Sequence, residues 1–124
     1  MARRILIVDD SAASRAVVAS ALEPEGYEVL AAEDGEAALE RLREAPVDLV
    51  ITDVNMPRLD GFGLLEALRR APETRFLPVL MLTTETAQEQ KRRAREAGAT
   101  GWIVKPFDGD RLLDVLQRVL PDPR

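Results

Sequence analysis

The chain contains 124 residues, enough for one domain and little more, and 46% of them are hydrophobic, which suffices for a buried core. The formal charge of -5 argues against direct nucleic-acid binding, because such binding needs a basic surface. Since cysteine and histidine are absent, the composition excludes disulfides, zinc–thiolate sites, cysteine nucleophiles and histidine bases. No apolar run approaches the roughly 20 residues of a membrane span. We therefore expect a cytoplasmic protein without membrane contact, whose chemistry uses carboxylates, hydroxyls, amines or a hard metal ion.

Five short apolar runs predict β-strands, and four of these runs are continuous, as in a parallel sheet covered on both faces. They cover residues 5–8, 29–32, 49–51, 79–82 and 102–104. The second run begins with polar residues, so we expect it at an edge of the sheet.

Helical patterns separate these runs. Three of the helices begin at predicted N-caps, which are Asp34, Thr86 with Glu89 in a capping box, and Asp108. The first helix has a predicted apolar face formed by Val17, Val18, Ala21 and Leu22. The fourth offers the core only three alanines, at 87, 94 and 97, so we expect it to be weakly anchored.

Five strands that alternate with five helices predict a three-layer, doubly wound α/β domain, (βα)5, with a parallel sheet. A closed barrel would need about eight such units. In open sheets of this kind, ligands bind beyond the carboxyl ends of the strands, which indicates where to search for chemistry.

Reactive side chains follow four of the five predicted strands. Asp9 and Asp10 follow the first strand, Asp53 the third, Thr83 the fourth and Lys105 the fifth. Three carboxylates at one edge repel each other and raise one another's pKa unless a cation neutralises them, and one lysine does not balance them. Oxygen ligands without histidine or cysteine select Mg²⁺, Mn²⁺ or Ca²⁺.

Such an incompletely coordinated ion is typical of sites that handle phosphate. Thr83 and Lys105 could bind phosphoryl oxygens, which leaves one carboxylate to act as a nucleophile and form an aspartyl phosphate. The chain contains neither a P-loop nor a dinucleotide-binding glycine motif. We therefore expect a phosphoryl donor other than a nucleotide held in a P-loop.

Five motifs carry a resemblance to the receiver domain of two-component response regulators, most closely to the stand-alone chemotaxis regulators of the CheY type. The motifs are IVDDS at 7–11, DVNMP at 53–57, DG at 60–61, TTE at 83–85 and GATGWIVKPF at 98–107. The resemblance covers residues 4–120 and implies a flavodoxin-like fold with strand order 2-1-3-4-5. It also implies that residues 1–124 form a single receiver domain with its core at 4–120.

The resemblance implies a role for each acidic residue. Asp53 is similar to the family's phosphoacceptor. Asp10, Asp53 and the backbone carbonyl of Asn55 would bind Mg²⁺ directly, and Asp9 would act through water. Asn55 and Glu85 flank the path of an attacking water, and their polar side chains imply a short-lived phosphoprotein.

The resemblance also implies roles for residues of the last two strands. Lys105 would neutralise the phosphoryl group and Thr83 would hydrogen-bond to it. Trp102 stands where the family usually has a tyrosine or phenylalanine that moves inward on activation. A tryptophan is larger and carries an N–H that needs a partner, so the alternative is a ring that stays in place. The Lys105–Pro106 bond resembles one that is cis in the family.

The function implied is a signalling switch. A sensor histidine kinase donates a phosphoryl group to Asp53, and the fourth helix, fifth strand and fifth helix then bind a downstream protein that the sequence does not identify. The chain would be a monomer or a weak dimer linked to phosphorylation, and would catalyse only its own phosphorylation and dephosphorylation. The basic residues between 91 and 95 are interpreted as a solvated face rather than a DNA-binding surface.

Two alternatives remain open. The chain could be the receiver half of a longer regulator with an output domain. It could also be a Mg²⁺-dependent phosphatase that works through an aspartyl phosphate, although such enzymes generally need a second Asp where this chain has Asn55.

Overall fold

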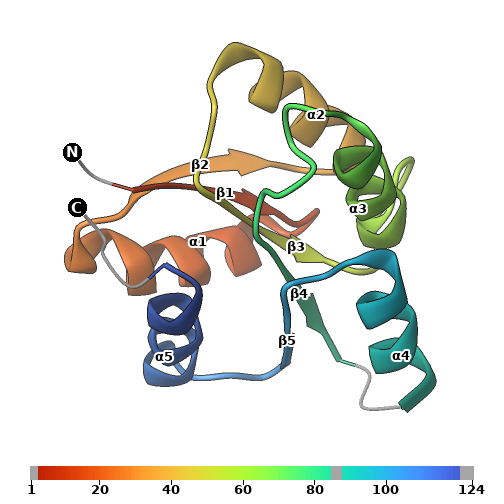
Figure 1. The fold of residues 1–124 in the computed structure, drawn as a ribbon. Coiled ribbons are helices and arrows are strands. Elements are labelled where there is room, and N and C mark those ends of the chain that lie inside the picture. The colour runs from red at the N-terminus through yellow and green to blue at the C-terminus, as the bar shows by residue number, and fades with distance from the viewer. Residues whose placement is uncertain (1–2, 85–87, 121–124) are drawn as a thin grey trace.

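A five-stranded parallel sheet lies at the centre of the molecule (Figure 1), whose computed structural model describes residues 3–84 and 88–120. The strand order is β2-β1-β3-β4-β5, which confirms the expected flavodoxin-like topology and the edge position of the second strand. The strands are β1 (Arg4–Val8), β2 (Glu28–Ala32), β3 (Leu49–Asp53), β4 (Val79–Thr83) and β5 (Gly101–Val104).

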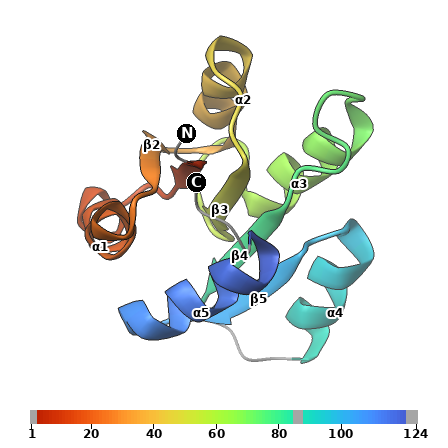
Figure 2. The same ribbon diagram turned by 60° about the vertical axis from the view of Figure 1, so that its left-hand side comes forward.

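Helices cover both faces of the sheet and complete three layers (Figures 1 and 2). Helices α1 and α5 pack on one face, and α2, α3 and α4 pack on the other. Their bounds are α1 (Ala12–Leu22), α2 (Gly35–Glu44), α3 (Gly61–Arg70), α4 (Gln88–Ala97) and α5 (Gly109–Val119), with a short 3-10 helix η1 (Glu23–Glu25) after α1.

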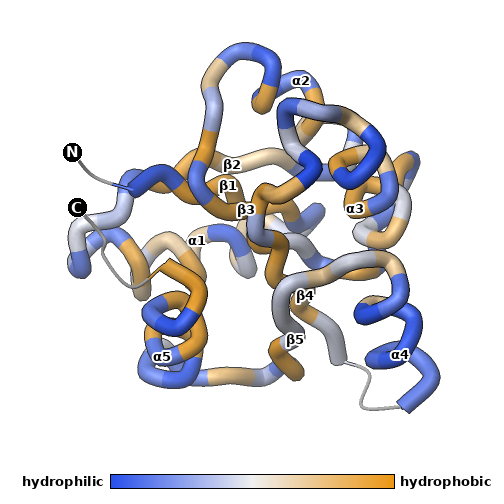
Figure 3. Tube along the Cα trace, in the orientation of Figure 1, coloured by the Kyte–Doolittle hydropathy of each residue, from blue (hydrophilic) through white to orange (hydrophobic). Residues whose placement is uncertain are grey.

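Successive residues of each strand enter two different cores, because side chains alternate across a sheet. Ile5 and Ile7 of β1 pack with α1 and α5, whereas Leu6 and Val8 pack with α2 and α3. Figure 3 shows the resulting pattern of apolar strands inside and polar helix surfaces outside. Burial on both faces explains why β1, β3 and β4 are apolar runs, whereas the edge strand β2 is partly exposed.

Short polar side chains begin the helices, largely as predicted. Asp34 accepts a hydrogen bond from the Ala37 amide at 2.8 Å, and Asp108 accepts one from the Arg111 amide at 2.7 Å. Asp60 caps α3 in the same way, through the Gly63 amide at 2.8 Å. The predicted capping box at 86 and the alanine at 87 lie outside the described residues.

The predicted apolar face of α1 was wrong at Val17, whose side chain is 62% exposed. Neighbouring residues of a helix point about 100° apart, so Val18 and Leu22, four residues apart, take the core-facing positions. Val17 lies on the flank of α1, where it lines a surface hollow of about 440 Å³ together with Phe107.

Two arginines anchor α4 where the sequence offers it little apolar surface. Of the described residues of α4 only Ala94 is fully buried. The guanidinium carbon of Arg93 lies 4.0 Å from the centroid of the Phe62 ring in α3, a cation–π contact. At the other end, Arg69 of α3 donates to the Gly98 carbonyl through Nε at 3.0 Å and Nη2 at 2.9 Å. Directional polar contacts with α3 thus supplement the small apolar surface of α4.

Replacing Arg69 by lysine is expected to lower the free energy of unfolding by about 1–3 kcal/mol. The planar guanidinium also donates through Nη1 to the carbonyls of Thr74, Arg75 and Leu77, and a lysine ammonium cannot reach both sets of acceptors. Urea denaturation measures the change, with Arg70→Lys on the exposed side of α3 as the matched control. Equal stability of the two variants would contradict the anchoring role.

Candidate functional site

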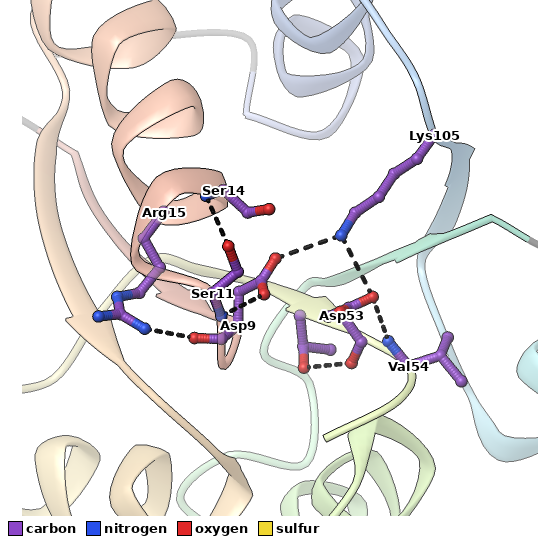
Figure 4. A network of polar contacts seen from close by, with 8 residues as sticks. Asp9, Ser11, Ser14, Arg15, Asp53, Val54 and Lys105 are labelled. Atoms are coloured by element: carbon purple, nitrogen blue, oxygen red, sulfur yellow. Dashed lines mark hydrogen bonds and ion pairs between the residues drawn. The ribbon is translucent and has the colours of Figure 1, made fainter. Parts of the chain in front are cut away.

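Two carboxylates and one ammonium meet at the carboxyl edge of the sheet (Figure 4). Lys105 Nζ lies 3.2 Å from Asp9 Oδ2 and 3.4 Å from Asp53 Oδ1. Strands β1 and β3 are neighbours in register, Val8 opposite Thr52, so the residues that follow these positions are adjacent. The long lysine side chain reaches them from the loop after β5.

Backbone and side-chain hydrogen bonds hold Asp9 in place. Asp9 is buried, and its Oδ1 accepts from the Ser11 amide at 2.9 Å. Ser11 Oγ in turn accepts from the Ser14 amide at 3.2 Å and caps α1, while Arg15 Nη1 donates to the Asp9 carbonyl at 2.6 Å. Sequence reasoning missed both. A serine just before a helical segment is a recognisable cap signal, whereas no sequence pattern indicated the Arg15 contact.

Asp53 occupies the last position of β3, where its side chain remains 16% exposed. Its Oδ1 accepts from the Val54 amide at 3.0 Å, and its carbonyl accepts from Thr52 Oγ1 at 2.9 Å. The carboxylate is therefore oriented by its neighbours and remains accessible from solvent.

The surroundings raise the pKa of Asp53 above its ordinary value. Partial burial is the largest cause, because it disfavours the charged form, and the negative charge of Asp9 adds to it. The Lys105 ammonium acts in the opposite direction without cancelling the effect. The effects of burial and of Asp9 on this pKa therefore exceed the effect of the lysine.

The residues present fit a hard divalent cation. Carboxylate oxygens of Asp9, Asp10 and Asp53 lie within 4.8 Å of one another, with Asp10 exposed to solvent. Among the described residues, only the Lys105 ammonium forms ion pairs with this trio, one with Asp9 and one with Asp53, so a single positive charge faces three carboxylates. An all-oxygen ligand set with excess negative charge suits Mg²⁺.

The other predicted site residues differ in their burial and in their position relative to this cluster. Thr83 is buried at the end of β4, and its carbonyl accepts from the Lys105 amide at 2.7 Å. Asn55 is exposed in the loop after β3. The Lys105–Pro106 bond is cis, which confirms that expectation. Glu85 lies outside the described residues.

Trp102 packs on the α4 side of the sheet, opposite Met81 of β4. It is partly buried and borders a small hollow of about 190 Å³ that Ala94 of α4 also lines. Its buried indole Nε1 has no hydrogen-bond partner within residues 3–84 and 88–120. The ring therefore lies beside α4, the helix that the sequence predicts to be weakly anchored.

Residues 5–117 match the family described as "Response regulator receiver domain". The chain belongs to this family. It is 41% identical over 117 residues to the chemotaxis protein CheY-3 of Vibrio cholerae, an alignment that covers 94% of this chain and 90% of that protein. It is also 38% identical over 120 residues to the phosphate regulon transcriptional regulatory protein PhoB of Escherichia coli, covering 97% of this chain and 52% of PhoB.

A solved structure of CheY4 from Vibrio cholerae has the same architecture. It superposes with a TM-score of 0.91 at 46% identity and covers 96% of this chain and 99% of that one. The chain is thus a receiver domain of a two-component response regulator, a family in which phosphorylation and Mg²⁺ binding are typical and which is not a classical enzyme family. In the described part of the chain, every helix is too short or too polar to cross a bilayer.

Replacing Asp53 by asparagine is expected to stabilise the metal-free protein at pH 7, by no more than about 1 kcal/mol because the site is partly screened. A raised pKa means that the folded chain binds a proton more readily than the unfolded chain. The free energy of unfolding therefore falls as pH rises from the ordinary carboxyl pKa to the raised one. Asp53→Asn has no carboxyl at this position, so its free energy of unfolding does not fall for this reason.

Thermal unfolding of both proteins across pH 3–8, with and without Mg²⁺, measures the difference. Mg²⁺ should reduce the variant's advantage, since a ligand stabilises the folded state that binds it. Asp114→Asn, on the exposed surface of α5, is the control and should show no gain. A destabilised Asp53→Asn protein at neutral pH would refute this description of the charges.

Proposed function

We propose that a sensor histidine kinase phosphorylates Asp53 in a Mg²⁺-dependent reaction and that the phosphorylated chain signals to a protein partner. The observation that carries this proposal is the position of Lys105 Nζ, 3.2 Å from Asp9 and 3.4 Å from Asp53. An ammonium beside an accessible carboxylate is where an incoming phosphoryl group needs positive charge.

The transfer requires only a nucleophile and charge neutralisation. An Asp53 carboxylate oxygen attacks phosphorus, a new P–O bond forms, and the P–N bond to the kinase histidine breaks as nitrogen leaves with the electron pair. Lys105 exchanges part of its interaction with Asp53 for the phosphoryl oxygens, and Thr83 donates its hydroxyl to another oxygen. The chain catalyses only this reaction and the later loss of its own phosphate.

Four residues would hold the divalent ion. Asp10, Asp53 and the backbone carbonyl of Asn55 bind it directly, and Asp9, which Lys105 already contacts, acts through water. Bound Mg²⁺ supplies positive charge that stabilises the transferring phosphoryl group. The support for this assignment is the 4.8 Å grouping of three carboxylates that one lysine does not neutralise.

The output surface in this proposal consists of α4, β5 and α5. A phosphoryl group adds close to two negative charges at neutral pH and draws Thr83 toward it, which frees space for Trp102 to move inward. The partly buried ring borders α4, and α4 is held by two arginines rather than by a wide apolar face. Weak apolar anchoring is what allows a helix to change position at small cost.

The downstream partner belongs to a chemotaxis-type pathway in this proposal, which rests on the CheY relatives. The PhoB match supports the second candidate, a receiver half that controls an output domain, because this chain aligns with about half of PhoB. Asn55 in place of a second acidic residue disfavours the phosphatase alternative.

The proposal also includes a cytoplasmic location, a monomer or weak phosphorylation-linked dimer, and no nucleic-acid or membrane contact by this domain. Arg92 on α4 pairs with Glu89 and Glu96, which supports interpreting that basic segment as a solvated face.

Acetyl phosphate with Mg²⁺ is expected to add one phosphate to the wild-type chain and none to Asp53→Ala. Intact-protein mass spectrometry, followed by peptide mapping, detects the modification. Asp48→Ala, at the opposite edge of the sheet before β3, is the control and should be labelled like the wild type. Labelling of Asp53→Ala at the wild-type level would place the phosphoacceptor elsewhere.

The phosphorylated protein is expected to lose its phosphate within seconds to a few minutes, and Asn55→Arg to slow that loss several-fold. Asn55 is exposed beside Asp53, so a longer cationic side chain can screen the phosphoryl group from water. Decay after removal of the donor measures the rate, with Arg75→Lys as a control far from the site. A wild-type phosphate that persists for hours, or an unchanged rate in Asn55→Arg, contradicts the proposed role of Asn55. Glu85 is the second residue proposed to tune this rate.

A further inference from the structure

One buried carboxylate joins the loop that follows Asp53 to the start of α2. Asp34 is 1% exposed. Its Oδ1 caps α2 through the Ala37 amide at 2.8 Å, and its Oδ2 accepts from Arg58 Nε at 2.8 Å and also contacts Arg58 Nη2. The two oxygens of one side chain thus fix a helix and a loop that are distant in sequence.

The backbone of Arg58 is unusual for its residue type. Its φ is 62°, in the left-handed region, which is unfavourable for a residue with a Cβ. Next to it, the Leu59 carbonyl accepts from the Gly35 amide at 3.0 Å, and a Cβ on Gly35 would lie 2.7 Å from that carbonyl oxygen. The ion pair with Asp34 offsets the strain and keeps these two backbone segments in contact.

This loop, residues 54–60, begins at the candidate metal site and closes back on it. The Gly61 amide donates to the Val54 carbonyl at 2.9 Å, so both ends of the loop are fixed beside Asp53. Between those ends, Arg58 is the side chain whose polar contacts tie the loop to α2. Arg58 and Asp10 line the same surface hollow, of about 440 Å³. Asn55 and Arg58 thus lie in one short loop whose two ends are fixed.

Arg58 also lies among several negative charges. Besides Asp34, its guanidinium lies 3.7 Å from Glu33 and 3.7 Å from Glu36. Removing this cation would make the surroundings of Asp10 more negative, so electrostatics alone predicts tighter binding of a divalent cation in its absence. If Arg58 positions the loop, its removal should instead weaken binding of the cation. The sign of the change in affinity therefore distinguishes the two effects.

We propose that Arg58 is a positioning residue that, through Asp34, holds the 54–60 loop so that the backbone at Asn55 joins the Asp9, Asp10 and Asp53 carboxylates in binding Mg²⁺. This inference rests on the Mg²⁺ site of the proposed function and extends it. In this inference, the Mg²⁺ affinity of the site depends on the Arg58–Asp34 ion pair, although neither residue is a proposed metal ligand.

Isothermal titration of metal-free protein with Mg²⁺ tests the inference. Arg58→Gly removes the side chain while its backbone accepts the left-handed conformation without strain. We expect it to weaken Mg²⁺ binding roughly tenfold, as is typical when support of a metal ligand is lost. Arg58→Lys, which keeps the charge and one donor, should recover part of the affinity. Arg75→Gln, the same loss of charge at the opposite edge of the sheet, should change it little.

Testing Arg58→Gly in a second variant, Asp34→Asn, distinguishes the loss of this ion pair from a general loss of structure. Asp34→Asn keeps an oxygen for the Ala37 amide but loses the ionic partner, so Arg58→Gly should have little further effect in Asp34→Asn protein. Amide hydrogen exchange adds a readout without metal, because the Gly35 amide should exchange faster in Arg58→Gly. Unchanged or tighter Mg²⁺ binding by Arg58→Gly would overturn the inference and leave the proposed function intact. A wild-type chain that does not bind Mg²⁺ would overturn both.

Discussion

The contact between Lys105 and the carboxylates of Asp9 and Asp53 depends on the sheet topology and determines the charge of the site. The strands of a parallel sheet all end at one edge, so residues at or just after the ends of β1, β3 and β5 converge there. The resulting cluster is not neutral, and the raised pKa of Asp53 shows that burial and Asp9 outweigh the lysine. An acidic site kept in this state favours ligands that bring positive charge, and a phosphoryl group accompanied by a divalent cation meets that condition.

The elements around this edge of the sheet differ in how much buried apolar surface holds them in place. Beneath it, β1, β3 and β4 are buried on both faces, and Ser11 and Arg15 fix the loop that carries Asp9. On the α4 side, arginine contacts supplement a small apolar surface made by Ala94 and Ala97, so less burial anchors this helix than anchors the central strands. This division suits a switch, because a rigid site can bind its ligand while a weakly packed helix responds to it.

Much of the fold followed from local patterns. Short apolar runs identified all five strands, and Asp34 and Asp108 identified two helix starts. The motifs identified the receiver family, which the comparisons confirm, together with the strand order. The prediction that Val17 belongs to the buried face of α1 was wrong. An apolar pattern on a helix does not indicate which of its residues neighbouring elements cover.

By itself, the sequence determined which chemistry is available here: carboxylates, one hydroxyl and one amine at strand ends, without histidine or cysteine. Only the tertiary structure decided how these groups are held. Arg58 pairs with Asp34, which lies 24 residues earlier, and Arg69 pairs with the carbonyl of Gly98, 29 residues later. Such contacts depend on how helices and loops pack around the sheet, and residue spacing along the chain carries no signal for them. The burial that shifts the pKa of Asp53 has the same origin, since it is a property of the assembled edge.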